Sequence, residues 1–439
     1  MKTIIFRCET VTPMFLGGAG RQMVDLRVPS FKGLMRFWWR AMNCSLPLHE
    51  MKGREAEMFG GGGEKGRRSG VTIRIKTRFT SEDIGRSLWK EIPFREKVSK
   101  RGKEYKVPEK YDGVAYLLYS VFMLNERPYL KTGLSFSIDF SSFSDDMLRQ
   151  SVASFWSLAY LGGIGSRARR GGGNIVVTDV ADEGNVLEET DLNFILNGRS
   201  NDEIGNWLVE NYKKARAVVN EDRKTRFISE YPNLSISRFI ISNTSFSTWK
   251  EALNEIGEKF MHFRTSNRGD VFGTAAFGLP RNHVSTNKEG VNRRSSPLIF
   301  KILKSKNNEC YWMALRLAGE FLPKNVVLKD GGRSQRPTYE KVDEFWNELK
   351  KHGKEHILSV PDTLDKVKEK IRKELLPKKI ILFGSKARGD FHEKSDIDIA
   401  VDTDKTIAFL DVNGAIDIVK LGKVNKSFRE KIKREGIEL

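Results

Sequence analysis

Alternating and helical patterns of apolar residues predict an α+β unit in the first 180 residues. Residues 1–13 alternate apolar and polar positions as a strand does, and Pro13 ends the run. An amphipathic helix follows, with Ser30 after Pro29 as its predicted N-cap. Its apolar stripe consists of Phe31, Leu34, Met35, Trp38 and Met42. The predicted elements are a strand at 1–13, a helix at 31–44, strands at 71–79 and 134–141, a helix at 147–162 and a strand at 174–180. This is the element order of a ferredoxin-like fold.

The same order is predicted again further along the chain, after acidic turns around residues 181–203. Its elements are a strand at 235–242, a helix at 248–263, strands at 297–304 and 311–319, and a helix at 340–352. A proline-bounded helix at 361–377 then opens a third, smaller unit. We therefore predict an α+β protein with ferredoxin-like domains at 1–180 and 181–355 and a small α/β domain at 361–439.

The predicted helix at 31–44 has a basic edge beside its apolar stripe. Lys32, Arg36 and Arg40 recur every fourth residue, and Trp39 borders them. Basic side chains near the N-terminus of a helix interact unfavourably with the helix dipole. They become favourable when an anion binds at that N-terminus. Cations for phosphates beside an aromatic ring for base stacking predict single-stranded nucleic acid as the partner. The alternative is that both tryptophans belong to the core and the basic side chains only solvate the outer face.

The charge of the chain also favours a polyanionic partner. The 76 Lys and Arg residues exceed the 57 Asp and Glu residues, which gives a net charge of +19. Residues 1–110 alone hold 24 basic and 12 acidic residues, and the basic stretch at 95–110 is predicted as a loop or hairpin tip. Binding to phosphates is favoured by the counterions that it releases. A generally basic proteome or thermal adaptation is the competing explanation.

Cysteine and hydropathy patterns exclude several classes of protein. Cys8, Cys44 and Cys310 are far apart and form no zinc or disulfide pattern, which predicts a reducing, cytoplasmic setting. The six histidines have no metal-ligand spacing. The apolar run at the N-terminus is too short for a signal peptide, and no stretch is long enough to span a membrane.

Two glycine-rich loops carry basic residues and adjoin predicted strands. They are residues 59–70, with Lys65, Arg67 and Arg68, and residues 162–174, with Arg167, Arg169 and Arg170. Glycine allows positive φ and lets backbone amides approach a phosphate closely, while arginine supplies charge and can stack on bases. A third basic loop, 281–296, adds Arg293 and Arg294. We predict that these loops bind nucleic acid, although a solvated surface loop is the usual alternative.

Three motifs together resemble the RAMP superfamily, and within it the first subunits of Cmr-type (type III-B) CRISPR effector complexes. They are VPSFKGLMRFWWRAMN, the MFGGGG and SGVTI pair, and GGIGSRARRGGGN, in a resemblance that covers about residues 1–355. The resemblance implies two RRM-like domains that bind RNA without cleaving it and require no cofactor. It also implies crRNA, target single-stranded RNA and other complex subunits as partners, near the 3′ end of the guide. By position, Lys32, Arg36, Arg40 and the loop 162–173 become the RNA-contact candidates, and no catalytic residue is carried over.

The sequence LFGSKARGDFHEKSDIDIAVD, residues 382–402, resembles the minimal nucleotidyltransferases. Asp396 and Asp398 are one residue apart on a predicted strand, so both can face one Mg²⁺ site. Gly384 and Ser385 would cradle phosphates, Arg388 could support their loop, and Asp417 could supply a third carboxylate.

Two features count against nucleotidyl transfer by this unit. The spacing between Asp398 and Asp417 is short for the crossover expected in that family, and residues 361–439 leave little room for a substrate-specific domain. The preferred hypothesis is therefore a non-catalytic RNA-binding subunit. The alternative is a metal-dependent nucleotidyltransferase that acts on an RNA or protein partner through Asp396 and Asp398.

Overall fold

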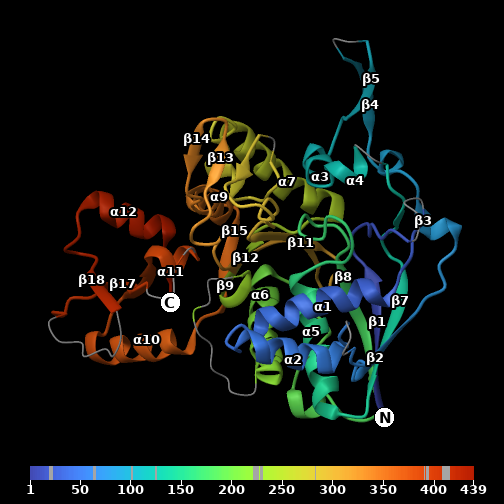
Figure 1. Ribbon diagram of the computed structural model, residues 1–439, viewed down its shortest axis with the longest axis horizontal. Coiled ribbons are helices and arrows are strands. Elements are labelled where there is room, and N and C mark those ends of the chain that lie inside the picture. Colours follow the sequence, from blue (N-terminus) through green and yellow to red (C-terminus); the bar gives the residue numbers. More distant parts are fainter. Residues whose placement is uncertain are drawn as a thin grey trace.

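The first unit is a four-stranded antiparallel sheet in the order β2-β7-β1-β8. The computed structural model (Figure 1) describes residues 1–18, 23–62, 66–99, 102–123, 126–220, 227, 231–281, 283–389, 391, 395–407 and 416–439. The strands are β1 (Lys2–Thr10), β2 (Val71–Lys76), β7 (Ser135–Ser142) and β8 (Ile175–Asp182). Helices α1 (Val28–Met42) and α5 (Asp145–Leu161) complete the βαββαβ order. The predicted ferredoxin-like arrangement is confirmed.

Helix α1 begins three residues earlier than predicted. Arg27 is its N-cap and makes no side-chain capping hydrogen bond, so the prediction that Ser30 caps the helix is wrong. Pro29 lies in the first turn, where a backbone N–H would have no helical partner in any case. The proline therefore starts the helix, and Ser30 lies inside it.

Segments that the periodicity did not predict surround this unit. Helix α2 (Leu48–Phe59) follows α1, and α6 (Asn201–Val219) leads into the second unit. Between β2 and β7 lie η1 (Ser81–Asp83), β3 (Ile84–Gly85), η2 (Leu88–Lys90), β4 (Phe94–Val98), β5 (Glu104–Pro108), α3 (Asp112–Leu117), α4 (Tyr119–Phe122) and β6 (Tyr129–Leu130). Strands β4 and β5 form the predicted hairpin, which projects from the body (Figure 1). Every helix in the described ranges is too short or too polar to traverse a bilayer.

The second unit repeats the same topology with the sheet order β11-β12-β9-β15. Its strands are β9 (Asn233–Ser242), β11 (Leu298–Lys304), β12 (Cys310–Ala318) and β15 (Gly353–Ser359), with helices α7 (Trp249–Ser266) and α9 (Glu340–Lys350). The predicted assignment of residues 340–352 as its second helix is confirmed. The smaller elements are η3 (Glu188–Thr190), α8 (Val271–Ala275), β10 (Ser285–Thr286), β13 (Leu328–Asp330) and β14 (Arg333–Gln335).

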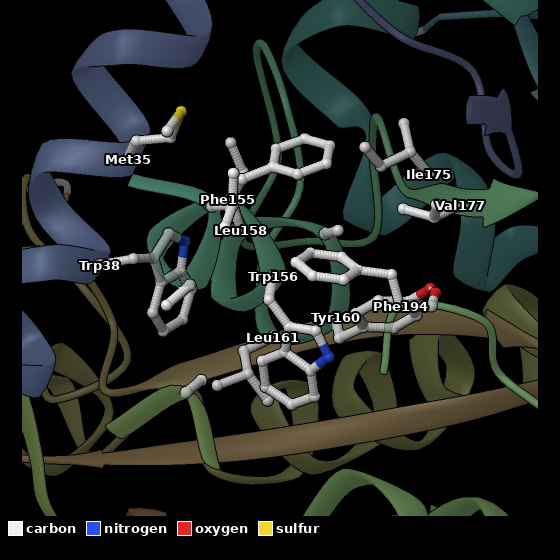
Figure 2. Close-up of a cluster of buried hydrophobic side chains, with 14 of the residues drawn as sticks. Met35, Trp38, Phe155, Trp156, Leu158, Tyr160, Leu161, Ile175, Val177 and Phe194 are labelled. Atoms are coloured by element: carbon white, nitrogen blue, oxygen red, sulfur yellow. The ribbon is translucent and has the colours of Figure 1, made fainter. Parts of the chain in front are cut away.

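Both faces of the second sheet are covered, and the hydrophobic cluster on one of them also includes the core of the first unit. Phe239 and Met313 on one face belong to the same buried cluster as α1, α5 and the first sheet. Ile240 and Trp312 on the other face are buried with residues of α7 and α9. Figure 2 shows the inner layer, where side chains of α5 gather between α1, β8 and the second sheet. A sheet buried on both faces explains why every residue of β9 is buried.

The C-terminal unit is a third sheet in the order β18-β17-β16-β19. Its elements are α10 (Asp362–Leu375), β16 (Lys379–Phe383), α11 (Gly384–Arg388), β17 (Ile397–Asp402), β18 (Ile416–Lys420), α12 (Lys426–Glu435) and β19 (Ile437–Glu438). Two neighbouring buried arginines of the second sheet bind its backbone: Arg316 donates to the carbonyl of Arg388 at 2.7 Å, and Arg238 donates to that of Gly436 at 3.4 Å. The C-terminal unit is thus docked on the second sheet.

The ion pair between Arg316 and Asp343 is buried beside this docking surface, with 4% and 3% of the two side chains exposed. We expect Asp343→Ala to lower the free energy of unfolding by about 3–5 kcal/mol, because it leaves a buried guanidinium without its counter-charge. Arg333→Ala is the matched control, since Arg333 pairs with Asp330 and is 68% exposed. It should cost no more than about 1 kcal/mol. Equal midpoints of denaturant unfolding for the two variants would contradict this prediction.

Candidate nucleic-acid interface

Two predicted RNA-contact residues on α1 bind another helix of the protein. Arg40 forms an ion pair with Glu55 at 2.8 Å, and Arg36 lies 3.3 Å from the same carboxylate. Arg36 also donates to the carbonyls of Phe59 and Gly60, at 2.8 and 2.5 Å, and so satisfies the C-terminus of α2. The four-residue spacing suggested a row of phosphate-binding side chains. In the structure it places Arg36 and Arg40 on the side of α1 that packs on α2, and both bind α2.

The aromatic part of the predicted α1 interface is also occupied within the protein. Trp39 is 1% exposed, and its indole N–H donates to Gln150 at 3.1 Å. The prediction that Trp39 is an RNA-contact residue is wrong, because its ring lies in the core under α5. Lys32 is half-buried and donates to Ser69 at 3.2 Å, and burial lowers its pKa.

The loop at 59–70 contributes two exposed arginines, one of which is paired within the protein. Arg67 forms an ion pair with Glu57, whereas Arg68 is exposed to solvent. Lys65 lies outside the described residues. In the basic loop at 281–296, Arg293 is exposed and Arg294 donates to the carbonyl of Glu320 at 2.6 Å.

The glycine loop at 162–174 is fixed against the body of the protein. A Cβ at Gly173, where φ is +63°, would lie 1.8 Å from the carbonyl oxygen of Ile164. Asn174 accepts a hydrogen bond from the amide of Ile302 at 2.8 Å, which attaches the loop to the second sheet. We had predicted that glycines in this loop allow a phosphate to approach the backbone. At Gly173 the glycine instead allows another part of the protein's own backbone to approach closely.

This fixed loop presents its three arginines to a cleft of about 730 Å³. The opposite walls come from α3, α4, α7 and residues 277–280. The structure adds Arg264 of α7 to the cleft, together with the aromatic side chains Tyr116, Tyr119, Phe260 and Phe277. Sequence reasoning missed Arg264, because a single basic residue in the last turn of a helix is ordinary.

Each loop arginine is held in place by a specific contact. Arg167 donates through Nε to the Ser120 hydroxyl at 2.8 Å. Arg169 donates to the carbonyl of Ser296 at 3.0 Å and lies over the ring of Phe37. Arg170 donates to the carbonyl of Phe277 at 3.0 Å. The guanidinium groups are therefore positioned before any ligand arrives.

The cleft is strongly positive. Burial, followed by repulsion from neighbouring arginines, lowers the pKa of Arg169 to about 10 and that of Arg170 to about 9. Both side chains stay charged at neutral pH, and no Asp or Glu is present among the described residues that line the cleft. Uncompensated positive charge in a partly desolvated cleft favours an anionic ligand.

The Gly-Ser turn of the C-terminal unit is shaped by two carboxylates, the half-buried Asp398 and the buried Glu435. Gly384 has a φ of +74°, and a Cβ there would lie 2.0 Å from Oδ2 of Asp398. Glu435 accepts hydrogen bonds from the amide of Gly384 at 3.2 Å and from Arg388 at 2.8 Å. Arg388 thus supports the turn, as predicted, and Ser385 lines a cavity of about 270 Å³ between this unit and the second one.

The three predicted metal-binding aspartates lie near one another. Strands β17 and β18 are parallel, and Asp398 lies directly beside Asp417, while Asp396 precedes β17. Their short spacing in sequence did not prevent this pairing. Burial, and next the charges of Asp417 and Asp396, raise the pKa of Asp398. Burial lowers the pKa of Lys386, whereas the negative charges of Asp396 and Asp398 act to raise it.

These carboxylates could hold Mg²⁺ only together with further oxygen atoms from a bound phosphate or from water. Within the described ranges, no three His, Cys, Asp or Glu side chains are grouped closely enough to hold a metal ion by themselves. Mg²⁺ is commonly bound by one or two carboxylates together with phosphates and water. Asp398 and Asp417 lie side by side on β17 and β18, so two carboxylates are available to one ion. Burial, and next the charges of Asp417 and Asp396, disfavour the ionised form of Asp398 and raise its pKa, and a bound cation would offset both effects.

Two families match separate parts of the chain. Residues 7–176 match the RAMP superfamily, and residues 364–437 match the nucleotidyltransferase domain. The CRISPR system Cmr subunit Cmr1-1 of Pyrococcus furiosus is 26% identical over 309 residues, which cover 68% of this chain and 82% of that protein. Subunit Cmr1-2 of the same organism is 31% identical over 194 residues, which cover 40% of this chain and 96% of that protein.

Solved structures with the same fold cover the RAMP part. Apo Cmr1 from Pyrococcus furiosus aligns with a TM-score of 0.57 at 21% identity, over 82% of this chain and 99% of that one. A chain of the type III-B Cmr-beta complex bound to cognate target RNA aligns with a TM-score of 0.51 at 13% identity, over 80% and 99% of the two chains. At these identities the likeness concerns the fold.

The carboxylate cluster predicts a pH-dependent stability. The pKa of Asp398 is raised in the folded protein, so its contribution to stability is present in acid and is lost as the pH rises through that pKa. We therefore expect Asp398→Asn to raise the thermal unfolding midpoint at neutral pH. The gain should vanish below about pH 3, where the carboxyl is protonated in both states. Asp404→Asn, at an exposed aspartate of the same unit, is the control. A destabilised Asp398→Asn variant at pH 7 would contradict this reasoning.

Proposed function

Because this chain belongs to the Cmr1 family of the RAMP superfamily, we propose that it is an RNA-binding subunit of a type III-B CRISPR effector complex. In this proposal residues 1–355 bind RNA and perform no chemistry. The partners are crRNA, single-stranded target RNA and other subunits of the complex, near the 3′ end of the guide. The two RRM-like folds and the arginine-lined cleft between them and the inserted helices support this role.

The cleft beside the glycine loop is the observation that carries the proposal. Its arginines come from the loop and from α7, and they offer guanidinium groups that suit phosphate oxygens. Tyr119 lies in the same cleft and is 44% exposed, so its ring is available for base stacking. Phosphate contacts and stacking do not read base edges, so sequence preference should be slight.

The α1 residues have a supporting part in this proposal. Arg36 and Arg40 are engaged with α2, so their loss should weaken the packing of α1 on α2 before it affects RNA. Lys32, Arg68 and Arg293 remain candidates for outer phosphate contacts, since they are half-buried or exposed. The interface is thus centred on the cleft rather than on helix α1.

The cleft predicts which arginines control RNA affinity. We expect Arg167→Ala/Arg169→Ala to weaken binding of a labelled uridine 20-mer, because two phosphate contacts are lost. The slope of log K against log salt should become shallower by about 1.4, at about 0.7 per phosphate on single strands. Fluorescence anisotropy across a salt series measures both quantities, and circular dichroism checks that the variant is folded.

The matched control is Arg74→Ala/Arg78→Ala, which removes two exposed arginines from the first sheet and its edge. It removes the same charge without touching the cleft, so its affinity and salt slope should stay near those of the wild type. Equal losses in both double variants would mean that only overall charge matters. Wild-type binding by Arg167→Ala/Arg169→Ala would reject the cleft as the RNA site.

A second candidate function, nucleotidyl transfer to an RNA or protein partner, is favoured by the pairing of Asp398 with Asp417. Asp398 and Asp417 would hold Mg²⁺, which would neutralise a bound triphosphate, and the turn at Gly384 and Ser385 would orient its phosphates. Glu435 and Arg388 keep that turn in shape.

Incubation with labelled ATP and Mg²⁺ tests this second candidate. If the unit is active, the wild type should transfer label, and Asp396→Asn/Asp398→Asn should reduce transfer to background. Asp404→Asn should retain the wild-type level. Label transfer that survives the loss of both aspartates would exclude this mechanism, and absence of transfer with every RNA and protein partner offered would leave residues 361–439 as a packing unit.

A further inference from the structure

We propose that Arg170, Arg264 and Arg281 form a subsite for a single phosphate group on the side of the cleft that α7 and residues 277–280 line. This inference refines the proposed RNA site and rests on it. Arg264 lines the cleft, and Arg281 follows Pro280 at its edge. The three residues come from the glycine loop, from the end of α7 and from the segment after α8.

Arg170 is the centre of the proposed subsite. Its guanidinium carbon lies 4.8 Å from the ring centroid of Phe260 and 5.2 Å from that of Phe300. Its Nη2 donates to the carbonyl of Phe277, so the group is held by two rings and one hydrogen bond. Its Nη1 is buried and has no hydrogen-bond partner in the described parts of the chain.

A buried charged donor without an acceptor destabilises the folded protein, because it has lost its hydrogen bonds to water and forms no other hydrogen bond. The cost is usually met where a ligand or an ion supplies the missing acceptor. Arg281 repeats the same feature, since its Nη1 is also buried and has no partner among the described residues. The two donors come from different segments, and Arg264 is a charged neighbour of both arginines.

Arg264 supplies the third positive group and shares the same aromatic support. Its guanidinium carbon lies 5.7 Å from the ring centroid of Phe260 and 5.9 Å from that of Phe277. Burial lowers the pKa of Arg170 and of Arg281, and in both cases Arg264 is the neighbour that lowers it most. Arg264 therefore repels both Arg170 and Arg281 in the absence of a ligand.

The surroundings do not compensate this charge. Asp270 and the hydroxyl of Tyr116 act on Arg281, and Tyr116 acts on Arg170, in the direction that raises the pKa. Asp270 is exposed and already accepts the amide of Gly273 at 2.8 Å. A single weakly coupled carboxylate leaves an excess of positive charge.

A phosphate group matches these requirements better than a carboxylate. It presents several oxygens around one centre, so it can accept from two or three guanidinium groups that converge from different directions. A phosphodiester within an RNA strand and a phosphomonoester at an RNA end share this chemistry. Tyr116 and Tyr119 line the cleft, where a nucleobase next to that phosphate could stack.

Inorganic phosphate tests the subsite independently of RNA. At constant ionic strength, replacing chloride by phosphate should raise the unfolding midpoint of the wild type and of the control Arg78→Gln. It should not raise that of Arg281→Gln or Arg264→Gln, which lose one donor group each. An equal rise in all four proteins, or no rise in the wild type, would overturn the subsite.

RNA binding by the same variants separates this inference from the proposed function. Arg281→Gln should weaken binding of the uridine 20-mer at least about tenfold, because a hydrogen bond to a charged group is lost in a desolvated site. If Arg281→Gln and Arg264→Gln bind RNA like the wild type while Arg167→Ala/Arg169→Ala does not, the subsite is wrong and the RNA cleft stands. If phosphate binds but no RNA does, the subsite stands and the RNA function fails.

Oligonucleotides with different ends identify the source of the phosphate. The same 20-mer is compared with hydroxyl groups at both ends, with a 5′-phosphate and with a 3′-phosphate. An equal loss of affinity for all three in Arg281→Gln assigns the subsite to a phosphate within the strand. A loss confined to one phosphorylated oligonucleotide assigns it to that end.

Discussion

The structure depends on the burial of helix α5 between the two sheets. The helix contacts β7 and β8 on one side and β11 of the second sheet on the other, as well as α1 and α6. Its serines can be buried because Ser151 and Ser154 donate to carbonyls of the helix itself, at 2.9 and 2.8 Å. Because α5 packs against other elements on all sides, the position of its C-terminus is fixed. The position of Gly162, where the glycine loop begins, is therefore fixed as well.

The C-terminus of α5 is also tied to the second sheet by polar contacts. The buried amine of Lys301 donates to the carbonyl of Gly162 at 2.9 Å, and the side-chain amide of Asn174 donates through Nδ2 to the same oxygen at 3.3 Å. Burial lowers the pKa of Lys301 to about 7. Both ends of the glycine loop are thus anchored at the junction of the two units, which is why its arginines face a cleft shared by both.

The docking of the C-terminal unit changes how its small size should be interpreted. Its Gly-Ser turn opens onto a cavity whose other wall comes from residues 320–326 and 336–339 of the second unit. Arg316 and Arg238 hold the unit in this orientation through backbone carbonyls. The second unit therefore provides a wall that residues 361–439 lack, and the size of the C-terminal unit alone does not decide whether a substrate could be enclosed.

The sequence by itself determined most of the strands and helices of the two ferredoxin-like units, because apolar periodicity and glycine or proline breaks report short-range geometry directly. It did not predict α2, α6 or the last strand of the second unit, β15. It also identified the loop at 162–174 and the aspartates of the C-terminal unit, whose residues are close together along the chain. Only the tertiary structure decided that Trp39 is core, that Arg36 and Arg40 bind α2, and that Arg264 lies near both Arg170 and Arg281. Burial and pairing depend on partners distant in sequence, and a helical stripe of cations looks the same whether it faces solvent, RNA or a carboxylate such as Glu55.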